Sequence, residues 1–362
     1  MALQPNLIEV TVWYRGVVEG RLARQVTNSL ADAAQTEGSY VQAFDNYTDL
    51  PDRVYVPCRS YARICPEPIA EPYTYVNSNP SLVVCTDAAL VKGCNVLKGI
   101  DPGGTLIVNT RRDPEFVLGL VKDLPQKARL KKVATLDAGT AHQPNTPQGG
   151  IEGSTEKAGT MRTAAALLGA IAKVTGMVSL ETLTKKAPAA AEMMAHGYAF
   201  VRELANPDYD PNDTASEAAE FGRRGKVDLI VPAPLPNGSQ EGHITGNYRL
   251  QRPVVDQKIC TACKICWVSC PDACITMVKD DEAAAAAAAA GEADGGLDGG
   301  ADGAVPAAAD GGGSAATGEK VKVNLKYCKG CGICWNVCPL KCIKPVDELD
   351  FAGGVVRITY SI

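Results

Sequence analysis

The strongest constraint on this chain is a cysteine pattern that occurs twice. CTACKICWVSCP begins at Cys260 and CKGCGICWNVCP begins at Cys328, and both have the spacing C-x2-C-x2-C-x3-C-P. Thiolates are soft ligands, so four of them suit either an iron–sulfur cube or a zinc ion. Structural zinc sites commonly use two separated C-x2-C pairs, whereas three cysteines follow one another here at x2 spacing. The spacing therefore favours iron–sulfur clusters, with zinc as the alternative.

In the bacterial ferredoxin pattern, the fourth cysteine of each run binds the other cluster. We therefore expect two 4Fe–4S clusters, each held by cysteines from both copies. The first cluster is assigned to Cys260, Cys263, Cys266 and Cys338. The second cluster is assigned to Cys328, Cys331, Cys334 and Cys270. The two halves would then form a pseudo-twofold unit with the clusters close together.

Each copy contains two further residues of interest. Cys274 and Cys342 follow the last motif cysteine at matching positions. A small buried residue is the simplest role for each, and an additional ligand is the alternative. Trp267 and Trp335 also match, and we expect both to pack against the core of the module rather than to take part in redox chemistry.

Composition places the chain among ordinary globular proteins. Apolar residues make up 46% and charged residues 21% of its 362 residues, and the formal net charge is −5. A small negative net charge does not favour binding to nucleic acid or to an anionic membrane surface. We find no signal peptide in MALQPNLIEV and no apolar run near the roughly 20 residues of a membrane span. We therefore expect a cytoplasmic protein, in which 14 cysteines indicate metal binding rather than disulfides.

Strands and helices alternate through residues 1–205. Strands are expected at 7–14, 40–47, 53–64, 80–86, 105–110 and 131–138. Helices are expected at 21–38, 87–100, 113–124 and 161–205, the last with Ser179 as an N-cap and a restart at Pro188. This alternation predicts an α/β domain with a mostly parallel sheet and crossover helices.

The composition changes after residue 205. Residues 206–247 are rich in Pro, Asn, Asp and Gly, which indicates an extended linker. A small α+β dicluster domain is expected over 248–362. Residues 280–319 interrupt it with an Ala/Gly stretch that carries nine acidic residues. We expect a flexible loop there, because the stretch has too few large apolar residues to offset its ordering entropy.

Four stretches of the first domain resemble the gamma subunit, or domain III, of 2-oxoacid:ferredoxin oxidoreductases. They are SYVQAFDNY, PSLVVCTDAALVKGCNVLKGIDPGGTLIVNT, VATLDAGTA and LLGAIAKVTGMVSLETL. The module from 248 to 348 is similar to the delta subunit of that family, which carries two 4Fe–4S clusters. The fused gamma–delta arrangement also resembles that of oxalate oxidoreductases.

The resemblance implies an electron-transfer and scaffold subunit of a larger enzyme. Thiamine diphosphate and Mg would be held on partner alpha and beta subunits, where the 2-oxoacid is decarboxylated. Electrons would then pass through the two clusters to ferredoxin. We assign no catalytic residue to this chain, because His142, His196 and His243 show no pairing with a nucleophile. A ferredoxin-like electron carrier for another redox complex is the alternative.

One loop departs from the family pattern. Family members usually have a G-x-G-G-Q-G loop after the first strand, whereas YRGVVEGRLARQ stands here and keeps only Gly16 and Gly20. Glu19 adds a like charge where a helix start would bind a phosphate. We therefore expect a tight strand-to-helix turn rather than a coenzyme A site. Oxalate, whose oxidation needs no acyl acceptor, is the leading substrate, with pyruvate or another coenzyme A-dependent 2-oxoacid as the alternative.

Overall fold

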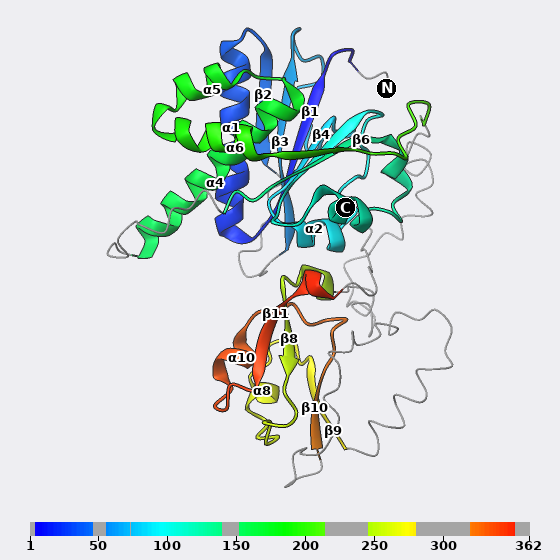
Figure 1. Cartoon of the computed structure of the whole chain (residues 1–362), viewed down its shortest axis with the longest axis vertical. Coiled ribbons are helices and arrows are strands. Elements are labelled where there is room, and N and C mark those ends of the chain that lie inside the picture. Colours follow the sequence, from blue (N-terminus) through cyan, green and yellow to red (C-terminus); the bar gives the residue numbers. More distant parts are fainter. Residues whose placement is uncertain are drawn as a thin grey trace, which may run out of the picture. The chain divides into compact units, whose positions relative to one another are not determined.

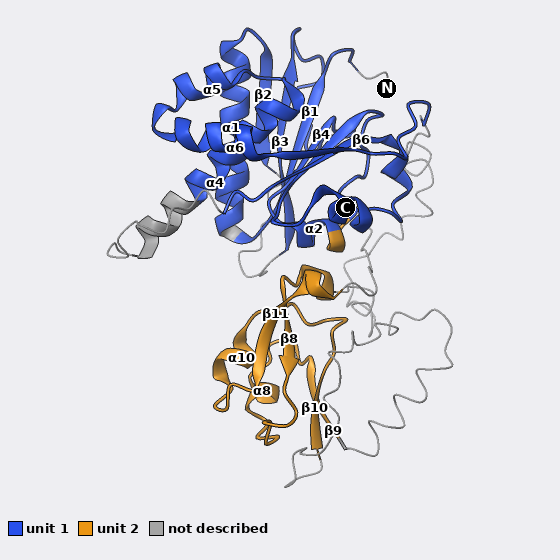
Figure 2. Ribbon diagram, viewed as in Figure 1, with its two compact units in different colours: residues 1–91, 95–230 blue, residues 92–94, 231–362 orange. Residues whose placement is uncertain are grey.

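The computed structural model describes residues 4–45, 56–72, 74–139, 152–213, 245–279 and 319–351. The chain divides into two compact units (Figure 2). The first comprises residues 1–91 and 95–230, and the second comprises residues 92–94 and 231–362. His142, His243, residues 214–244 of the expected linker and residues 280–318 of the expected flexible loop lie outside the described residues.

The first unit is built on one seven-stranded sheet with the order β2-β3-β1-β4-β5-β6-β7 (Figure 1). The pairs β1–β4, β4–β5 and β5–β6 are parallel, and the pairs nearer the two edges are antiparallel. The predicted mostly parallel arrangement is thus found in the centre of the sheet. The strands are β1 (Ile8–Arg15), β2 (Tyr40–Asp45), β3 (Pro57–Cys65), β4 (Leu82–Cys85), β5 (Gly104–Asn109), β6 (Leu130–Leu136) and β7 (Arg202–Ala205).

The conformation of the central strand β4 is explained by its burial, and that of the edge strand β7 by its pairing with β6. All four residues of β4 are buried, as expected for a parallel strand that is covered on both faces. β7 pairs with β6, so the expectation of helix throughout 161–205 is wrong for its last four residues. Four residues are too few to show a strand period in the sequence. Their conformation is therefore decided by the sheet edge beside them.

Four helices pack together over one face of the sheet (Figure 1). They are α1 (Gly16–Thr36), α4 (Glu152–Thr175), α5 (Leu180–Lys186) and α6 (Ala191–Phe200). The other elements are α3 (Pro114–Leu120), η1 (Pro125–Arg129), η2 (Pro188–Ala190) and α2 (Ala88–Gly93), of which residues 88–91 belong to the first unit and residues 92–93 to the second. Ser179 caps α5 as predicted, because its hydroxyl accepts the Thr182 N–H at 3.1 Å. The described helices include none that is both long and apolar enough to cross a bilayer.

Helices α4 and α6 approach closely because each presents a glycine to the backbone of the other. A Cβ atom at Gly169 would lie 1.9 Å from the carbonyl oxygen of Met194. A Cβ atom at Gly197 would lie 1.8 Å from the carbonyl oxygen of Ala166. No side chain fits at either contact, so the spacing of this helix pair depends on both glycines.

The second unit contains two short antiparallel sheets, and each takes one strand from each half of the cysteine module. β8 (Gln251–Val255) pairs with β11 (Ile343–Asp347), and β9 (Ile275–Lys279) pairs with β10 (Glu319–Val323). The helical elements are α8 (Ile265–Val268), α10 (Ile333–Val337), η3 (Thr245–Tyr248) and η4 (Glu348–Asp350). The halves therefore interlock instead of folding as separate lobes.

Replacing Gly169 with alanine should destabilise the first unit. The added methyl group would overlap the Met194 carbonyl, and separating the two helices should cost about 1–3 kcal/mol. Gly119→Ala in α3 is the matched control, because nothing lies within 4 Å of its Cβ position and alanine favours helix. Urea unfolding followed by circular dichroism measures both variants. Equal stabilities would contradict the close helix contact.

Candidate metal centres

The first cysteine motif folds around one pocket of the second unit. The cysteines that line this first pocket are Cys260, Cys263, Cys266, Cys338 and Cys342. Three of them come from the first motif, one is the last cysteine of the second motif, and one follows that motif. Cys263 is exposed, whereas Cys266 and Cys338 are buried. Apolar side chains such as Val321 and Ile343 complete the wall.

The second pocket repeats this arrangement with the motifs exchanged. Its cysteines are Cys328, Cys331, Cys334, Cys270 and Cys274. The structure therefore brings together, in each pocket, the four cysteines that the sequence assigns to one cluster. Main-chain hydrogen bonds also join the two halves of the cysteine module. The Asp256 N–H donates to the Cys342 carbonyl at 2.8 Å, and the Asn324 N–H donates to the Cys274 carbonyl at 2.7 Å.

The two motif loops also share an unusual backbone conformation. Ala262 and Gly330, at matching positions, have φ values of 52° and 68°. Lys264 and Gly332 match in the same way, at 66° and 91°. A left-handed residue other than glycine costs roughly 1 kcal/mol, so Ala262 and Lys264 are held there by their surroundings. Such turns direct successive backbone N–H groups into a concavity that suits a negatively charged group.

Burial raises the pKa of several pocket thiols in the absence of a cation. It raises the pKa of Cys266 and Cys328, and it raises the pKa of Cys334 to about 12. For Cys338 burial acts in the same direction, but hydrogen bonds from the Cys342 side chain and from backbone N–H groups lower its pKa overall. Because thiolates are the metal-binding form, loading either pocket must release protons.

The donor set of each pocket fits a thiolate-bound group. Four motif sulfurs face a cavity with mainly apolar walls, and soft sulfur ligands suit iron–sulfur clusters. Among the described residues, no three Cys, His, Asp or Glu side chains lie close enough together to bind one metal ion directly.

The matching tryptophans differ in their environment. Trp335 packs against the core of the unit, as predicted, whereas Trp267 is 46% exposed, so the prediction for Trp267 is wrong. The Trp335 ring lies over Gly332, where an added Cβ atom would be only 3.1 Å away. Lys264 stands at the position that matches Gly332, and its ammonium group forms an ion pair with Glu319 at 2.9 Å.

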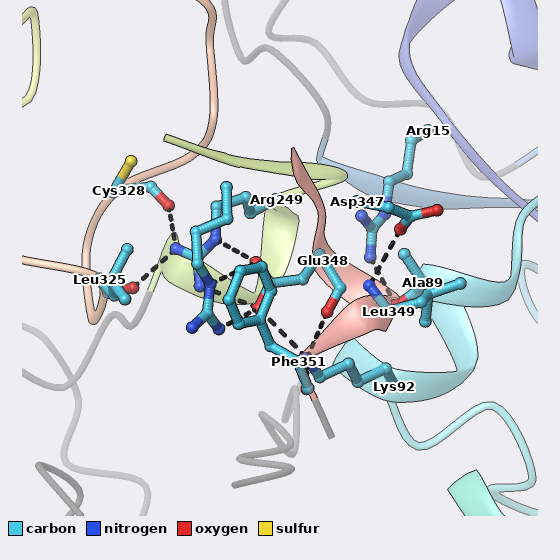
Figure 3. Close-up of polar contacts among 11 residues, drawn as sticks. Arg15, Ala89, Lys92, Arg249, Leu325, Cys328, Asp347, Glu348, Leu349 and Phe351 are labelled. Carbon is cyan, nitrogen blue, oxygen red and sulfur yellow. Dashed lines mark hydrogen bonds and ion pairs between the residues drawn. The ribbon is translucent and has the colours of Figure 1, made fainter. Parts of the chain in front are cut away.

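A cluster of buried charged side chains holds the main chain at the start of the second cysteine motif (Figure 3). Arg249 donates to the carbonyl oxygen of Cys328 at 2.7 Å and to the carboxylate of Glu348 at 2.6 Å. Arg252 and Lys92 of the same unit also contact Glu348, at 2.7 and 3.2 Å. Burial opposes the charge on Glu348, but hydrogen bonds from the two arginines lower its pKa to about 2. This network could not be predicted from the sequence, because Arg249 and Glu348 are 99 positions apart and belong to no motif.

Comparison with known proteins identifies the family. Residues 24–193 match the pyruvate ferredoxin/flavodoxin oxidoreductase family. The common gamma subunit of the pyruvate/ketoisovalerate oxidoreductases of Pyrococcus abyssi is 34% identical over 178 residues, which is 49% of this chain and 83% of that subunit. This chain belongs to the family.

Two further proteins are similar to parts of this chain. The pyruvate synthase subunit PorD of Thermotoga maritima is 28% identical over 114 residues, which is 32% of this chain and 77% of that subunit. The pyruvate oxidoreductase subunit PORC from Thermotoga maritima, whose crystal structure is known, is 26% identical in sequence to this chain. The structural match covers 55% of this chain and 98% of that subunit, with a TM-score of 0.41.

In this family member, the turn after β1 is closed by a carboxylate of the chain itself. β1 ends at Arg15 and α1 begins at Gly16, whose φ of 68° allows the abrupt turn, so the predicted tight strand-to-helix turn is confirmed. Glu19 accepts the Arg15 N–H at 3.1 Å and the Thr86 hydroxyl at 2.6 Å. Burial raises the pKa of Glu19.

The position of Glu19 bears directly on anion binding. Thr86 directly follows β4, so the carboxylate lies at the carboxyl end of the parallel strands, where α/β folds commonly bind ligands. The start of a helix attracts negative charge, and here an internal carboxyl group already lies beside it. α1 begins at residue 16 rather than at the predicted 21, because this contact stabilises its first turn.

Replacing Glu348 with glutamine should destabilise the second unit at neutral pH by roughly 3 kcal/mol, given a pKa of about 2 against an ordinary 4.5. A lowered carboxyl pKa stabilises the fold above pH 4.5, and this contribution is lost as the pH falls towards 2. The difference between wild type and Glu348→Gln should therefore shrink across that window. Amide hydrogen exchange of residues 249–255 and 343–348 measures it.

The exposed ion pair of Glu181 and Lys185 provides the control for this measurement. Glu181→Gln should leave hydrogen exchange in the second unit unchanged, because exposed pairs contribute little. A Glu348→Gln effect that stays constant from pH 7 to pH 2 would contradict the role given to the arginines.

Proposed function

We propose that this chain is the electron-transfer and scaffold subunit of a thiamine-diphosphate-dependent 2-oxoacid:ferredoxin oxidoreductase. The observation that carries the proposal is the exchange of the fourth cysteine between the two pockets. That exchange is the ligand pattern of two-cluster ferredoxins. The family of the first unit supports the same assignment, because its relatives are subunits of oxidoreductase complexes.

The eight motif cysteines would hold two 4Fe–4S clusters, one in each pocket. When bound, such clusters supply one-electron transfer. The chain contributes the four sulfurs of each site, backbone N–H groups that stabilise their charge, and apolar walls that limit access of water. Arg249 holds the carbonyl of Cys328 and so orients the start of the second motif.

Partner subunits complete the proposed enzyme. Alpha and beta subunits would bind thiamine diphosphate and Mg and carry out the decarboxylation, and ferredoxin would accept the electrons. His196, the one histidine among the described residues, lies against Phe200 with ring centroids 4.6 Å apart. A side chain packed in this way supports a structural role for that residue.

Glu19 favours oxalate as the substrate of the complex. Its carboxyl group is 2.6 Å from Thr86 at the place where a glycine-rich loop would approach a pyrophosphate. Oxidation of oxalate to carbon dioxide needs no acyl acceptor, so it is compatible with a closed turn. Oxidation of pyruvate or another 2-oxoacid with coenzyme A is the second candidate, and the pyruvate/ketoisovalerate relatives favour it.

Paired cysteine variants should separate the two possible ligand arrangements. With the proposed exchange, Cys260→Ala with Cys338→Ala removes two ligands from one cluster and leaves one intact cluster of about four iron atoms. Cys328→Ala with Cys338→Ala damages both clusters and leaves neither intact. Iron analysis and electron paramagnetic resonance of the anaerobic complex measure this. If Cys260→Ala with Cys338→Ala left no intact cluster and Cys328→Ala with Cys338→Ala left one, each cluster would be held by the four cysteines of a single motif. A wild-type protein that contains zinc and no iron would exclude both clusters.

Turnover of the purified complex should distinguish the substrates. We expect oxalate oxidation coupled to ferredoxin reduction that is unchanged by coenzyme A, because the turn after β1 is closed. Pyruvate and 2-oxoglutarate, each with and without coenzyme A, are the comparison substrates. Strict dependence on coenzyme A would exclude the oxalate assignment. A native protein that runs as a monomer without a thiamine-binding partner would instead favour a ferredoxin-like carrier.

A further inference from the structure

Each cysteine pocket contains a fifth sulfur that the ligand assignment leaves unused. Cys342 lines the first pocket and Cys274 lines the second. Both side chains are 3% exposed, and each directly precedes a strand of the second unit. A buried alanine would fill the same place, so the thiol group of each residue calls for its own explanation.

The two additional thiols make different contacts. The Cys342 sulfur lies 3.4 Å from the Cys338 sulfur, within hydrogen-bonding distance for sulfur. The Cys274 sulfur instead lies 3.4 Å from the carbonyl oxygen of Asp272. The sulfur of Cys270, which corresponds to Cys338, receives the backbone N–H of Cys274 at 3.3 Å. A thiol has a single proton, and the geometry directs that of Cys274 to the Asp272 carbonyl although Cys270 is also its neighbour, whereas the Cys342 thiol lies within 3.4 Å of an assigned ligand sulfur.

The direction of the bond at Cys342 follows from ligand chemistry. A cysteine that binds iron does so as a thiolate and has no proton to donate. In the loaded pocket, Cys342 must therefore be the donor and the Cys338 sulfur the acceptor. A hydrogen bond to a charged acceptor strengthens as the negative charge increases, and reduction adds one negative charge to the cluster. The bond therefore stabilises the reduced form more than the oxidised form.

We propose that the Cys342 thiol donates a hydrogen bond to the Cys338 sulfur and thereby raises the reduction potential of the first-pocket cluster. This inference rests on the proposed function, because it requires a cluster in each pocket. Hydrogen bonds to the ligand sulfurs are among the factors that set cluster potentials. Cys342 is thus a positioning residue that acts on the cluster through Cys338.

The test uses the complete complex, purified anaerobically, with Cys342→Ala, Cys342→Ser and Cys274→Ala. Iron per chain and the midpoint potentials from redox titrations followed by electron paramagnetic resonance are measured for each. The cluster that survives in Cys260→Ala with Cys338→Ala identifies the second-pocket signal. All three variants should retain about eight iron atoms.

Cys342→Ala should lower the reduction equilibrium constant of the first-pocket cluster about tenfold, which for one electron is 59 mV. Cys342→Ser should keep most of the wild-type potential, because a hydroxyl also donates. Cys274→Ala should change the second-pocket potential much less, because its thiol is engaged by the Asp272 carbonyl.

Four results would overturn the inference. Unchanged potentials in Cys342→Ala, or equal shifts in Cys342→Ala and Cys274→Ala, would show that the thiol contact does not tune the cluster. Loss of a cluster in Cys342→Ala would make Cys342 a ligand rather than a donor. Wild-type complex without iron would overturn the proposed function itself, and this inference with it.

Discussion

The arrangement of the second unit depends on strand pairing between two halves that are distant in sequence. β8 pairs with β11 and β9 pairs with β10, so neither half has a complete sheet of its own. This pairing places the end of each cysteine motif beside the beginning of the other motif. The two mixed pockets follow from it, because the fourth sulfur of each motif can reach only the neighbouring site.

Buried charge is the second constraint on this unit. The arginines around Glu348 offset the cost of its burial, and Arg249 also holds the main chain at Cys328. Burial instead raises the pKa of pocket thiols such as Cys266 and Cys334, which favours their protonated form. A loaded pocket would reverse that balance, since an iron cluster supplies the positive charge that makes thiolates stable.

The first unit fills, with a side chain of its own, a position where α/β folds commonly bind anions. Its central parallel strands end at one edge, and Glu19 reaches that edge from the first turn of α1. The contact with the Arg15 N–H explains why the helix starts directly after the strand. The chain therefore combines a family scaffold with a ligand edge that is closed from within.

The sequence by itself determined the features that depend on local spacing and local conformation. Motif spacing grouped the cysteines, alternating periodicity indicated the α/β unit, and Ser179 marked a helix start. The tertiary structure alone decided the strand at 202–205, the exposure of Trp267 and the contacts of Glu19 and Glu348. It also decided that Cys342 faces a sulfur whereas Cys274 faces a carbonyl. A pattern of neighbouring residues reports local preference, but these contacts join residues far apart in the chain and depend on which surfaces pack together.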